Sequence, residues 1–270
     1  MIFYSNAKIN LGLEIISKRE DGLHNINSFF LPIPTSDVIE IKKDLSINEK
    51  CLISYSGFLF ENNSDDLILK AYNLLSKDHS LSSIKVHLHK NIPIGSGLGG
   101  GSSNASHMLI ALNQFFDLNL DLKTLLKYAS LIGSDCPFFI YNCLSHVTGN
   151  GSSVKPITFN MPRCYLVIIK PNFNISTSDI FSNFCFDKKS NKSLVLSDDI
   201  NQWKNNLYND LESVAFSLFP ELKDIKIQLY NMGANFASMT GSGSSIYGFF
   251  NNKPSKKIFY KNYWIWEGYI

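Results

Sequence analysis

The residues with the clearest capacity for chemistry form one glycine-rich stretch, Pro93-Ile94-Gly95-Ser96-Gly97-Leu98-Gly99-Gly100-Gly101-Ser102-Ser103-Asn104-Ala105. Because glycine has no Cβ, backbone N–H groups in such a stretch can approach a ligand closely. A helical pattern starts at Ala105, and a helix N-terminus offers unpaired N–H groups and a positive dipole end to an anion. A Gly/Ser run can also be a flexible linker. Since this run lies between a strand pattern and a helix pattern, we favour a phosphate-binding loop.

Three known kinds of glycine loop can be tested against the neighbouring residues. A P-loop requires a lysine after its last glycine, and residues 100–103 contain none. The spacing Gly95-x-Gly97-x-x-Gly100 matches a dinucleotide-binding fingerprint, but its candidate acid, Asp117, lies between two helical patterns instead of ending a strand. A protein-kinase loop requires V-A-I-K, H-R-D and D-F-G motifs, which the chain lacks. The loop is therefore none of these three.

Two further segments carry polar residues of interest. Lys8 and Asn10 share the polar face of an alternating strand pattern, and Asp135 lies in a loop just before Pro137. By themselves, such residues are more often a solvated lysine and a turn aspartate.

Three separated segments resemble the motifs of the GHMP kinase superfamily, in that superfamily's order. They are Ala7-Lys8-Ile9-Asn10-Leu11, the glycine stretch, and Thr240-Gly241-Ser242-Gly243. Asp21-Gly22-Leu23-His24 and Gly133-Ser134-Asp135-Cys136-Pro137-Phe138, with the triple glycine, resemble one branch of it. That branch uses ATP to phosphorylate the 2-hydroxyl of a cytidine-diphosphate-linked methylerythritol in the non-mevalonate isoprenoid pathway.

The resemblance implies an α+β fold of two domains. Residues 1–156 would form an ATP-binding domain like ribosomal protein S5 domain 2, and residues 157–270 a ferredoxin-like domain. Strand patterns followed by clustered helix patterns in both halves also favour the α+β class.

The resemblance also implies roles for individual residues. Asp135 would be the general base and Lys8 its partner, while Lys90 and every residue from Pro93 to Asn104 would contact ATP. The residues expected to hold the substrate are Asn10, His24, Thr177, Phe181, Gly241 and Ser242. Mg²⁺ is expected with the nucleotide, but the sequence identifies no ligands for it.

Two positions depart from the family pattern. Leu23 stands where the family usually has an aromatic residue that would stack on cytosine. Asp66 stands where the family often has asparagine beside adenine, and a carboxylate lacks the amide donor. Two alternatives therefore remain: a GHMP kinase for another small alcohol such as homoserine or mevalonate, and a nucleotide-binding protein without turnover.

The composition is that of an ordinary globular enzyme. The 270 residues carry a net charge of +2, which disfavours a nucleic-acid partner. No apolar run is long enough for a membrane span, and no basic segment with a long apolar run resembles a signal peptide. Five widely spaced cysteines suggest free thiols. We expect a cytoplasmic protein with a small-molecule substrate, as a monomer or weak homodimer.

Residue periodicity predicts the following elements. Strands are expected at residues 8–16, 38–42, 52–55, 84–89, 138–141, 165–169, 236–239, 246–250 and 263–266, with a short helix before the last of them. Helices are expected at residues 65–76 with Ser64 as the cap, from 105 to 116, after Asp121 until Gly133, and at 210–219 and 220–233. Residues 149–156 are expected to be a loose domain junction, and residues 188–206 a surface insertion.

Overall fold

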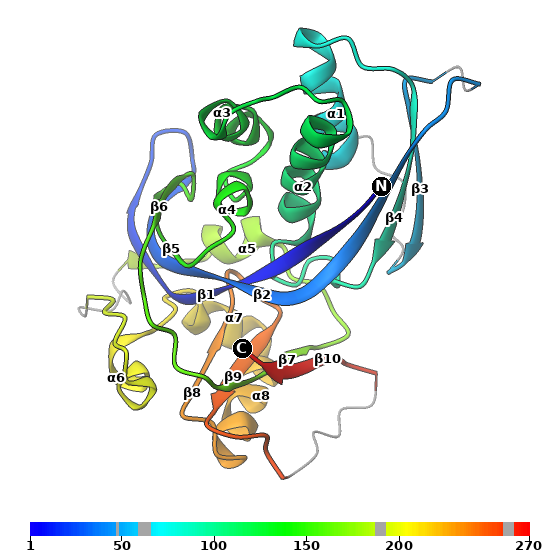
Figure 1. Cartoon of the computed structure of the whole chain (residues 1–270). Coiled ribbons are helices and arrows are strands. Elements are labelled where there is room, and N and C mark those ends of the chain that lie inside the picture. The colour runs from blue at the N-terminus through cyan, green and yellow to red at the C-terminus, as the bar shows by residue number, and fades with distance from the viewer. Residues whose placement is uncertain (47–48, 59–65, 187–192, 256–261) are drawn as a thin grey trace.

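A computed structural model describes residues 1–46, 49–58, 66–186, 193–255 and 262–270 of the chain (Figure 1). The chain is of the α+β class, as the sequence predicts, with two sheets and helices packed against each. Within the described residues, no helix is long and apolar enough to cross a membrane.

The first sheet is organised around two long strands that pair along almost their whole length. Its strands are β1 (Ile2–Lys18), β2 (His24–Lys43), β3 (Cys51–Gly57), β4 (Ile84–Lys90), β5 (Ser145–Gly149) and β6 (Ser153–Pro156). On the edge of β2 away from β1, β4 pairs with residues 38–43 and β5 with residues 26–30. Only β3 and β4 pair in parallel. Because β2 extends past both partners, it joins the two ends of the sheet.

Helices cover one side of this sheet, above the β1–β2 ribbon in Figure 1. They are α1 (Leu67–Asp78), α2 (Gly100–Phe115), α3 (Leu122–Ile132) and α4 (Cys136–Tyr141). Their apolar faces and those of β2 and β4 share one buried cluster, in which Tyr72, Leu109 and Ile39 are fully buried. Each helix buries one stripe of its surface against the sheet, and this is why its apolar residues recur at helical spacing in the sequence.

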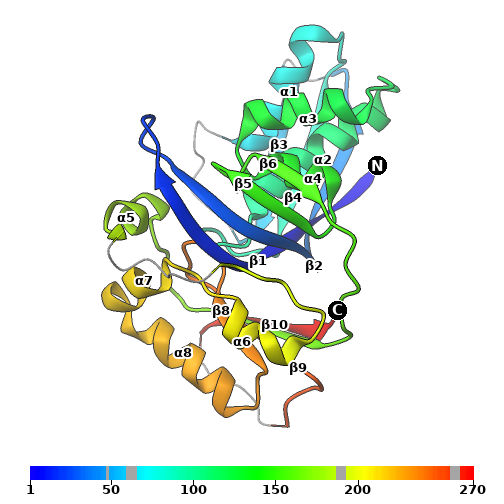
Figure 2. The same ribbon diagram turned by 90° about the vertical axis from the view of Figure 1, so that its left-hand side faces the viewer.

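The second sheet has the strand order β10-β7-β9-β8 and pairs in an antiparallel manner. Its strands are β7 (Tyr165–Lys170), β8 (Phe236–Met239), β9 (Ile246–Phe250) and β10 (Trp264–Tyr269). The helices of this half are α5 (Thr177–Ser182), α6 (Trp203–Asn206), α7 (Glu212–Leu218) and α8 (Pro220–Asn231), with a 3₁₀ turn at Ile200–Gln202. Figure 2 shows α7 and α8 on the side of this sheet away from the β1–β2 ribbon. The sheet is therefore packed on both faces.

The two halves meet along β1. Its Leu13 donates a backbone hydrogen bond to Tyr208 (2.7 Å) and accepts one from Asp210 (2.9 Å), so a segment of the second half pairs with the free edge of β1. Alternate residues of β1, including Ile9, pack in a buried cluster with residues of β7 and β9. The other face of this strand is buried as well, because Lys8 lies against Gly99 and Asn10 against Thr240.

Most predicted elements are present, but the strand expected at residues 138–141 is wrong. These residues belong to helix α4, in which Pro137 occupies the first turn. A short apolar run has no periodicity that separates a strand from a buried helical turn, and proline at the first turn favours the helix. Phe138 and Phe139 are fully buried in it.

Four other expectations need correction. Residues 149–156 are not a loose junction, because β5 and β6 form a hairpin on the first sheet. The described part of 188–206 is not simply a surface insertion, since Trp203 is fully buried against Phe236 and Phe249. Ser64, the expected cap of α1, lies outside the described residues, and the side chain of Asp66 caps that helix. The last strand begins at Trp264 and runs to Tyr269, further than the predicted 263–266.

Candidate functional site

The glycine stretch forms the connection between β4 and α2. Gly95, Gly97 and Gly99 all have positive φ, a conformation that costs other L-residues free energy. A Cβ on Gly97 would collide with the backbone carbonyl of Thr240. Gly99 precedes the first turn of α2, and no side chain caps that turn. The stretch therefore leaves the N-terminus of a 16-residue helix open to a ligand.

A cavity of about 410 Å³, here called the glycine-loop cavity, lies beside this turn. Its polar side consists of predicted ATP contacts, namely Lys90, residues 93–97, residues 99–101 and Asn104. Its other side is mostly apolar and includes Leu67, Ile68 and Leu88, with Asp66 among them. Such a cavity offers hydrogen-bond donors for an anion at one end and an apolar surface for a flat ring at the other.

Not every residue of the stretch faces the cavity. The side chain of Leu98 is fully buried in the core between β1 and the second sheet. The hydroxyl of Ser103 donates to the backbone carbonyl of Asn6 (2.6 Å) and is buried. Ser102 lines a second cavity instead. The stretch thus divides between ligand-facing and fold-stabilising positions, which its sequence does not distinguish.

The structure brings Lys8 and Asp135 together. Nζ of Lys8 lies 3.6 Å from Oδ2 of Asp135, with the lysine side chain 5% and the aspartate side chain 29% exposed. Lys8 comes from the middle of β1, and Asp135 from the turn that begins α4. The pair is therefore assembled by the packing of α4 against the sheet, with the carboxylate open to a ligand.

Lys8 is held by three further contacts. Its ammonium donates to Oδ1 of Asn10 at 2.7 Å and lies 4.4 Å from the ring centre of Phe30. Its stem lies against Gly99, where a Cβ would be only 3.1 Å from Cγ of Lys8. Burial lowers the pKa of Lys8 below its usual value of 10.5, and Asp135 partly opposes this shift. A negative charge arriving beside it would favour the protonated form further.

The second cavity, of about 720 Å³ and here called the inter-sheet cavity, opens at the Lys8–Asp135 pair. All six predicted substrate contacts line it: Asn10, His24, Thr177, Phe181, Gly241 and Ser242. Gly97 and Gly99 line both cavities, so the two meet at the glycine stretch. A group bound in one cavity can therefore be adjacent to a group bound in the other.

Thr240 joins three parts of this site. Its hydroxyl lies 3.2 Å from Oδ1 of Asn10 and 3.1 Å from the carbonyl oxygen of Gly97, and it accepts from the backbone N–H of Asn10 at 3.1 Å. Asn10 also donates to Ser28 at 3.0 Å. The third motif is thereby tied to the first and second, although these are distant in the sequence.

An aromatic group stands at the far end of the inter-sheet cavity. The ring centres of His24 and Phe181 lie 5.0 Å apart, and the ring of Phe186 stacks with that of His24 at 6.1 Å. Leu23 is half exposed and lines the cavity where the family pattern predicts an aromatic residue. Burial lowers the pKa of His24 below its usual value of 6.5, so the ring is neutral at neutral pH.

Lys90 is placed on the wall of the glycine-loop cavity, but its ammonium is already paired. It forms a buried ion pair with Asp37 and donates to Oδ1 of Asn104 at 3.0 Å. Asp37 belongs to no sequence motif. It stands beside the strand pattern that begins at Val38, and a charged residue in such a place is usually exposed.

Asp66, the second departure from the family pattern, is fully engaged within the fold. Its Oδ1 accepts backbone N–H groups of Ile68 (2.7 Å) and Leu69 (3.1 Å), and its Oδ2 accepts the hydroxyl of Tyr55. It lies on the wall of the glycine-loop cavity as the cap of α1. An asparagine at this position could form similar cap contacts. Aspartate in place of asparagine therefore preserves the start of α1.

Possible metal ligands do not gather in this structure. Across the part of the chain that the structure describes, no three His, Cys, Asp or Glu side chains form a metal-binding group.

Comparisons with known proteins agree on one family. Two family models match, described as GHMP kinases N terminal domain over residues 66–143 and GHMP kinases C terminal over residues 191–262. A relative from Azobacteroides pseudotrichonymphae, named 4-diphosphocytidyl-2-C-methyl-D-erythritol kinase, is 44% identical over 261 residues. The match covers 96% of this chain and 96% of the relative.

Solved structures show the same likeness. A crystal structure of 4-(cytidine 5'-diphospho)-2C-methyl-D-erythritol kinase matches with a TM-score of 0.78 and 28% identity, over 92% of this chain and 89% of that one. A homoserine kinase from Cytophaga hutchinsonii matches with a TM-score of 0.66 and 19% identity, over 93% of this chain and 85% of that one. The second likeness concerns the fold alone.

Proposed function

Because this chain belongs to the GHMP kinase family, in the group of the 4-diphosphocytidyl-2-C-methyl-D-erythritol kinases, we propose that it phosphorylates that alcohol with ATP. The γ-phosphoryl group goes to the 2-hydroxyl, a step of the non-mevalonate isoprenoid pathway. The observation that carries the proposal is the Lys8–Asp135 pair, 3.6 Å apart, where the two cavities meet.

Nucleotide binding in this proposal uses the glycine-loop cavity. The triphosphate lies against the open first turn of α2, where unpaired N–H groups and the helix dipole favour negative charge. The adenine lies toward Leu67, Ile68 and Leu88. The γ-phosphoryl group then points toward Gly99, which lines both cavities.

Asp135 acts as the general base. Its carboxylate takes the proton of the attacking hydroxyl as the oxygen forms a bond to the γ-phosphorus and the bond to the ADP oxygen breaks. The partly exposed carboxylate can receive a hydroxyl from the inter-sheet cavity. Asp135 is protonated at the end of the step and returns its proton to solvent.

Lys8 acts on charge and position. Its ammonium keeps Asp135 ionised and stabilises the negative charge of the transferring phosphoryl group. Its contact with Asn10 holds the side chain in one orientation, so little reorganisation is needed when ATP binds.

The alcohol binds in the inter-sheet cavity. Its cytidine lies near His24 and Phe181, whose rings provide flat apolar surface. Leu23 supplies an aliphatic contact where other members of the family use an aromatic ring. Gly241, Ser242 and Thr177 surround the middle of the cavity, and the hydroxyl of Thr177 lies 2.9 Å from that of Ser242.

Mg²⁺ bound with the nucleotide would supply positive charge that offsets the charge of the phosphates. It would be held chiefly by phosphate oxygens and water, with the Ser102 hydroxyl on the cavity wall as a side-chain oxygen available to it. The chain itself contributes the donors that orient the phosphates.

The division into residues 1–156 and 157–270 is part of the proposal. It assigns the first sheet with α1–α4 to ATP and the second sheet with α5–α8 to the far wall of the substrate cavity. The inter-sheet cavity takes its wall from both parts, since it includes Asp135 from one and Phe181 from the other.

We assign the reaction to the cytoplasm. No disulfide joins cysteines within the described residues, and burial raises the pKa values of Cys136 and Cys164 to about 11. Protonated, buried thiols suit a reducing compartment, where they stay unmodified.

A parallel substrate assay tests the function. The purified full chain is given ATP and Mg²⁺ with 4-diphosphocytidyl-2-C-methyl-D-erythritol, homoserine or mevalonate, and mass spectrometry follows the addition of one phosphate. We expect product only from the cytidylated alcohol. Phosphorylation of homoserine or mevalonate instead would support a kinase activity but contradict the proposed substrate. Formation of ADP that does not depend on any of the alcohols would contradict both the kinase activity and the substrate.

A further inference from the structure

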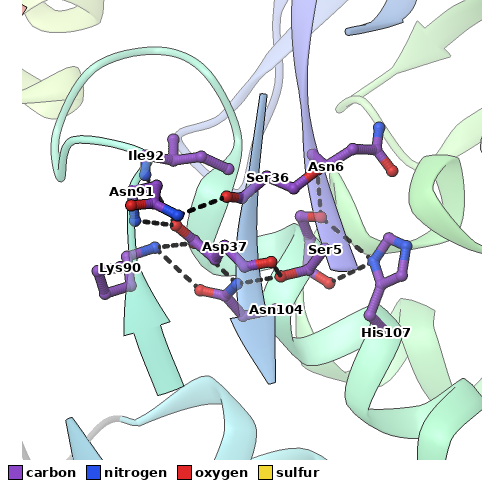
Figure 3. Close-up of polar contacts among 10 residues, drawn as sticks. Ser5, Asn6, Ser36, Asp37, Lys90, Asn91, Ile92, Asn104 and His107 are labelled. Carbon is purple, nitrogen blue, oxygen red and sulfur yellow. Dashed lines mark hydrogen bonds and ion pairs between the residues drawn. The ribbon is translucent and has the colours of Figure 1, made fainter. Parts of the chain in front are cut away.

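A buried carboxylate stands behind the wall of the glycine-loop cavity without lining it. Asp37 in β2 is fully buried and forms an ion pair with Lys90, while its Oδ2 also accepts Nδ2 of Asn104 at 2.9 Å. Its Oδ1 accepts the backbone N–H groups of Asn91 (2.8 Å) and Ile92 (2.7 Å). Figure 3 shows the carboxylate at the centre of these groups. The partners of the carboxylate therefore lie at the end of β4, in the two residues before the glycine stretch, and in α2.

These contacts join three segments on either side of the glycine stretch, and the hydrogen bond between Lys90 and Asn104 adds a direct link between two of them. Lys90 ends β4, Asn91 and Ile92 lead into the glycine stretch, and Asn104 lies in the first turns of α2. Lys90 and Asn104 line the glycine-loop cavity, whereas Asp37 does not. Asn104 also donates to the hydroxyl of Ser5 in β1 at 2.7 Å. One carboxylate thus sets the spacing between both ends of the glycine stretch.

The Asp37 carboxylate also neutralises the positive charge of Lys90 near the start of α2. Nζ of Lys90 lies close to the N-terminal turn of α2, since a Cβ on Gly100 would be 3.3 Å from it. A cation at a helix N-terminus opposes the helix dipole, and a buried unpaired ammonium is strongly unfavourable. Asp37 cancels that charge, so Lys90 can be buried there while its stem forms cavity wall.

From these contacts we infer that Asp37 is a positioning residue for the nucleotide, which holds Lys90 and Asn104 in the wall of the glycine-loop cavity. It touches neither substrate and acts through those two side chains and the backbone that enters the glycine stretch. The inference rests on the proposed use of this cavity for ATP. It differs from a direct role of the Lys90 charge, because that charge is already neutralised by Asp37.

The test is the isosteric substitution Asp37→Asn. An amide places an N–H where Oδ2 now accepts from Lys90 and Asn104, so the wall must rearrange. We expect the dissociation constant of ADP, measured by calorimetry, to rise at least about tenfold, the scale of losing one buried charge-assisted contact. The KM for ATP should rise in parallel, while the KM for the alcohol stays within about twofold. A purely structural role would lower the melting temperature and leave both KM values unchanged.

Asp44→Asn is the matched control. Asp44 follows the end of the same strand and pairs with Lys85 of β4 at 2.8 Å, but this pair lies on the surface away from both cavities. It should leave ADP binding within about twofold of the unsubstituted chain, as expected for an exposed pair. If folded Asp37→Asn protein binds ADP as tightly as the unsubstituted chain, or more tightly, the inference is wrong.

A double variant covers the case in which Asp37→Asn does not fold. Asp37→Asn with Lys90→Met removes the ammonium that would otherwise be buried without a counter-charge. This protein should fold cooperatively and still bind ADP at least about fivefold more weakly, because Asn104 has lost its carboxylate partner. ADP binding equal to that of the unsubstituted chain would overturn the inference. Because calorimetry with ADP needs no turnover, it remains informative if the chain phosphorylates none of the three alcohols.

Discussion

Nζ of Lys8 lies 3.6 Å from Oδ2 of Asp135 and 2.7 Å from Oδ1 of Asn10, so a single buried ammonium faces one carboxylate and one amide. The amide is fixed in turn by Thr240 and Ser28. The side chain of Asp135 is 29% exposed and lines the inter-sheet cavity. The pair therefore combines a buried, hydrogen-bonded cation with an accessible carboxylate.

Asp135→Asn should abolish most turnover without preventing nucleotide binding. An amide has nearly the same shape but cannot take the proton of the attacking hydroxyl, so kcat should fall by about 10²–10⁴. The dissociation constant of ADP should change little, since Asp135 lines only the inter-sheet cavity. Rapid-quench kinetics and calorimetry measure the two quantities. A variant that keeps more than a tenth of the original kcat would remove Asp135 from the role of base.

Activity should decline at alkaline pH because of Lys8. Burial lowers the pKa of Lys8 below 10.5, so the ammonium loses its proton at a lower pH than an exposed lysine. The kcat/KM, which reports the pKa values of the free enzyme, should therefore fall as the pH rises through this lowered pKa. Lys8→Met should have a low kcat/KM without this alkaline decline. A pH–rate profile unchanged in shape by Lys8→Met would show that another group causes the decline.

Conformational stability should respond to pH in the opposite direction. Between the lowered pKa of Lys8 in the folded chain and 10.5 in the unfolded chain, the unfolded state binds more protons. The free energy of unfolding should therefore increase with pH across that window, relative to Lys8→Met. Urea unfolding at a series of pH values measures the difference. An equal pH dependence in both proteins would mean that Lys8 titrates alike when folded and unfolded.

Gly99→Ala should damage catalysis beyond its effect on the backbone. Gly99 has a φ of +72°, and a Cβ there would be 2.9 Å from the ring of Phe139 and 3.1 Å from Cγ of Lys8. Gly233, at +97°, has nothing within 4 Å of its added Cβ and serves as the control for strain alone. Each alanine should cost about 1–2 kcal/mol of stability through strain. Only Gly99→Ala should also reduce kcat, by more than about tenfold, as expected when reacting groups are displaced.

Equal kcat values in the two alanine variants would indicate that Lys8 and Phe139 move aside without consequence. The comparison requires that both proteins are folded at the assay temperature, which thermal melting establishes.

Thr240→Val should loosen the connection between the three motifs. The substitution keeps the shape of the side chain and removes the contacts of its hydroxyl with Asn10 and Gly97. We expect kcat/KM to fall about tenfold, since a buried donor and acceptor lose their partner at a cost of about 1–3 kcal/mol. Ser245→Ala is the control in the same loop, because the buried hydroxyl of Ser245 has no hydrogen-bond partner. A loss in Ser245→Ala equal to that in Thr240→Val would attribute the effect to general loosening of the loop.

Local residue patterns determined much of the fold. The strand at residues 84–90 and the helices from Leu122 and Pro220 follow from alternation, helical spacing and terminal residues, all of which act over a few residues. The error at residues 138–141 arose where the pattern was too short. Pro137 and the burial of Phe138 and Phe139 then decided the conformation in favour of a helix.

The sequence by itself determined which residue types could act: a glycine stretch for phosphate, a lysine, an aspartate, and a third small loop at Thr240. Only the tertiary structure decided their relations. It separated Ser103, bound to Asn6, from the cavity-lining glycines, and it paired Lys90 with Asp37, which carries no motif. The physical reason is that contacts between distant segments arise when α2 and α4 pack on the β1–β2 ribbon. Such packing assigns a partner to each buried polar group, and local periodicity holds no information about that partner.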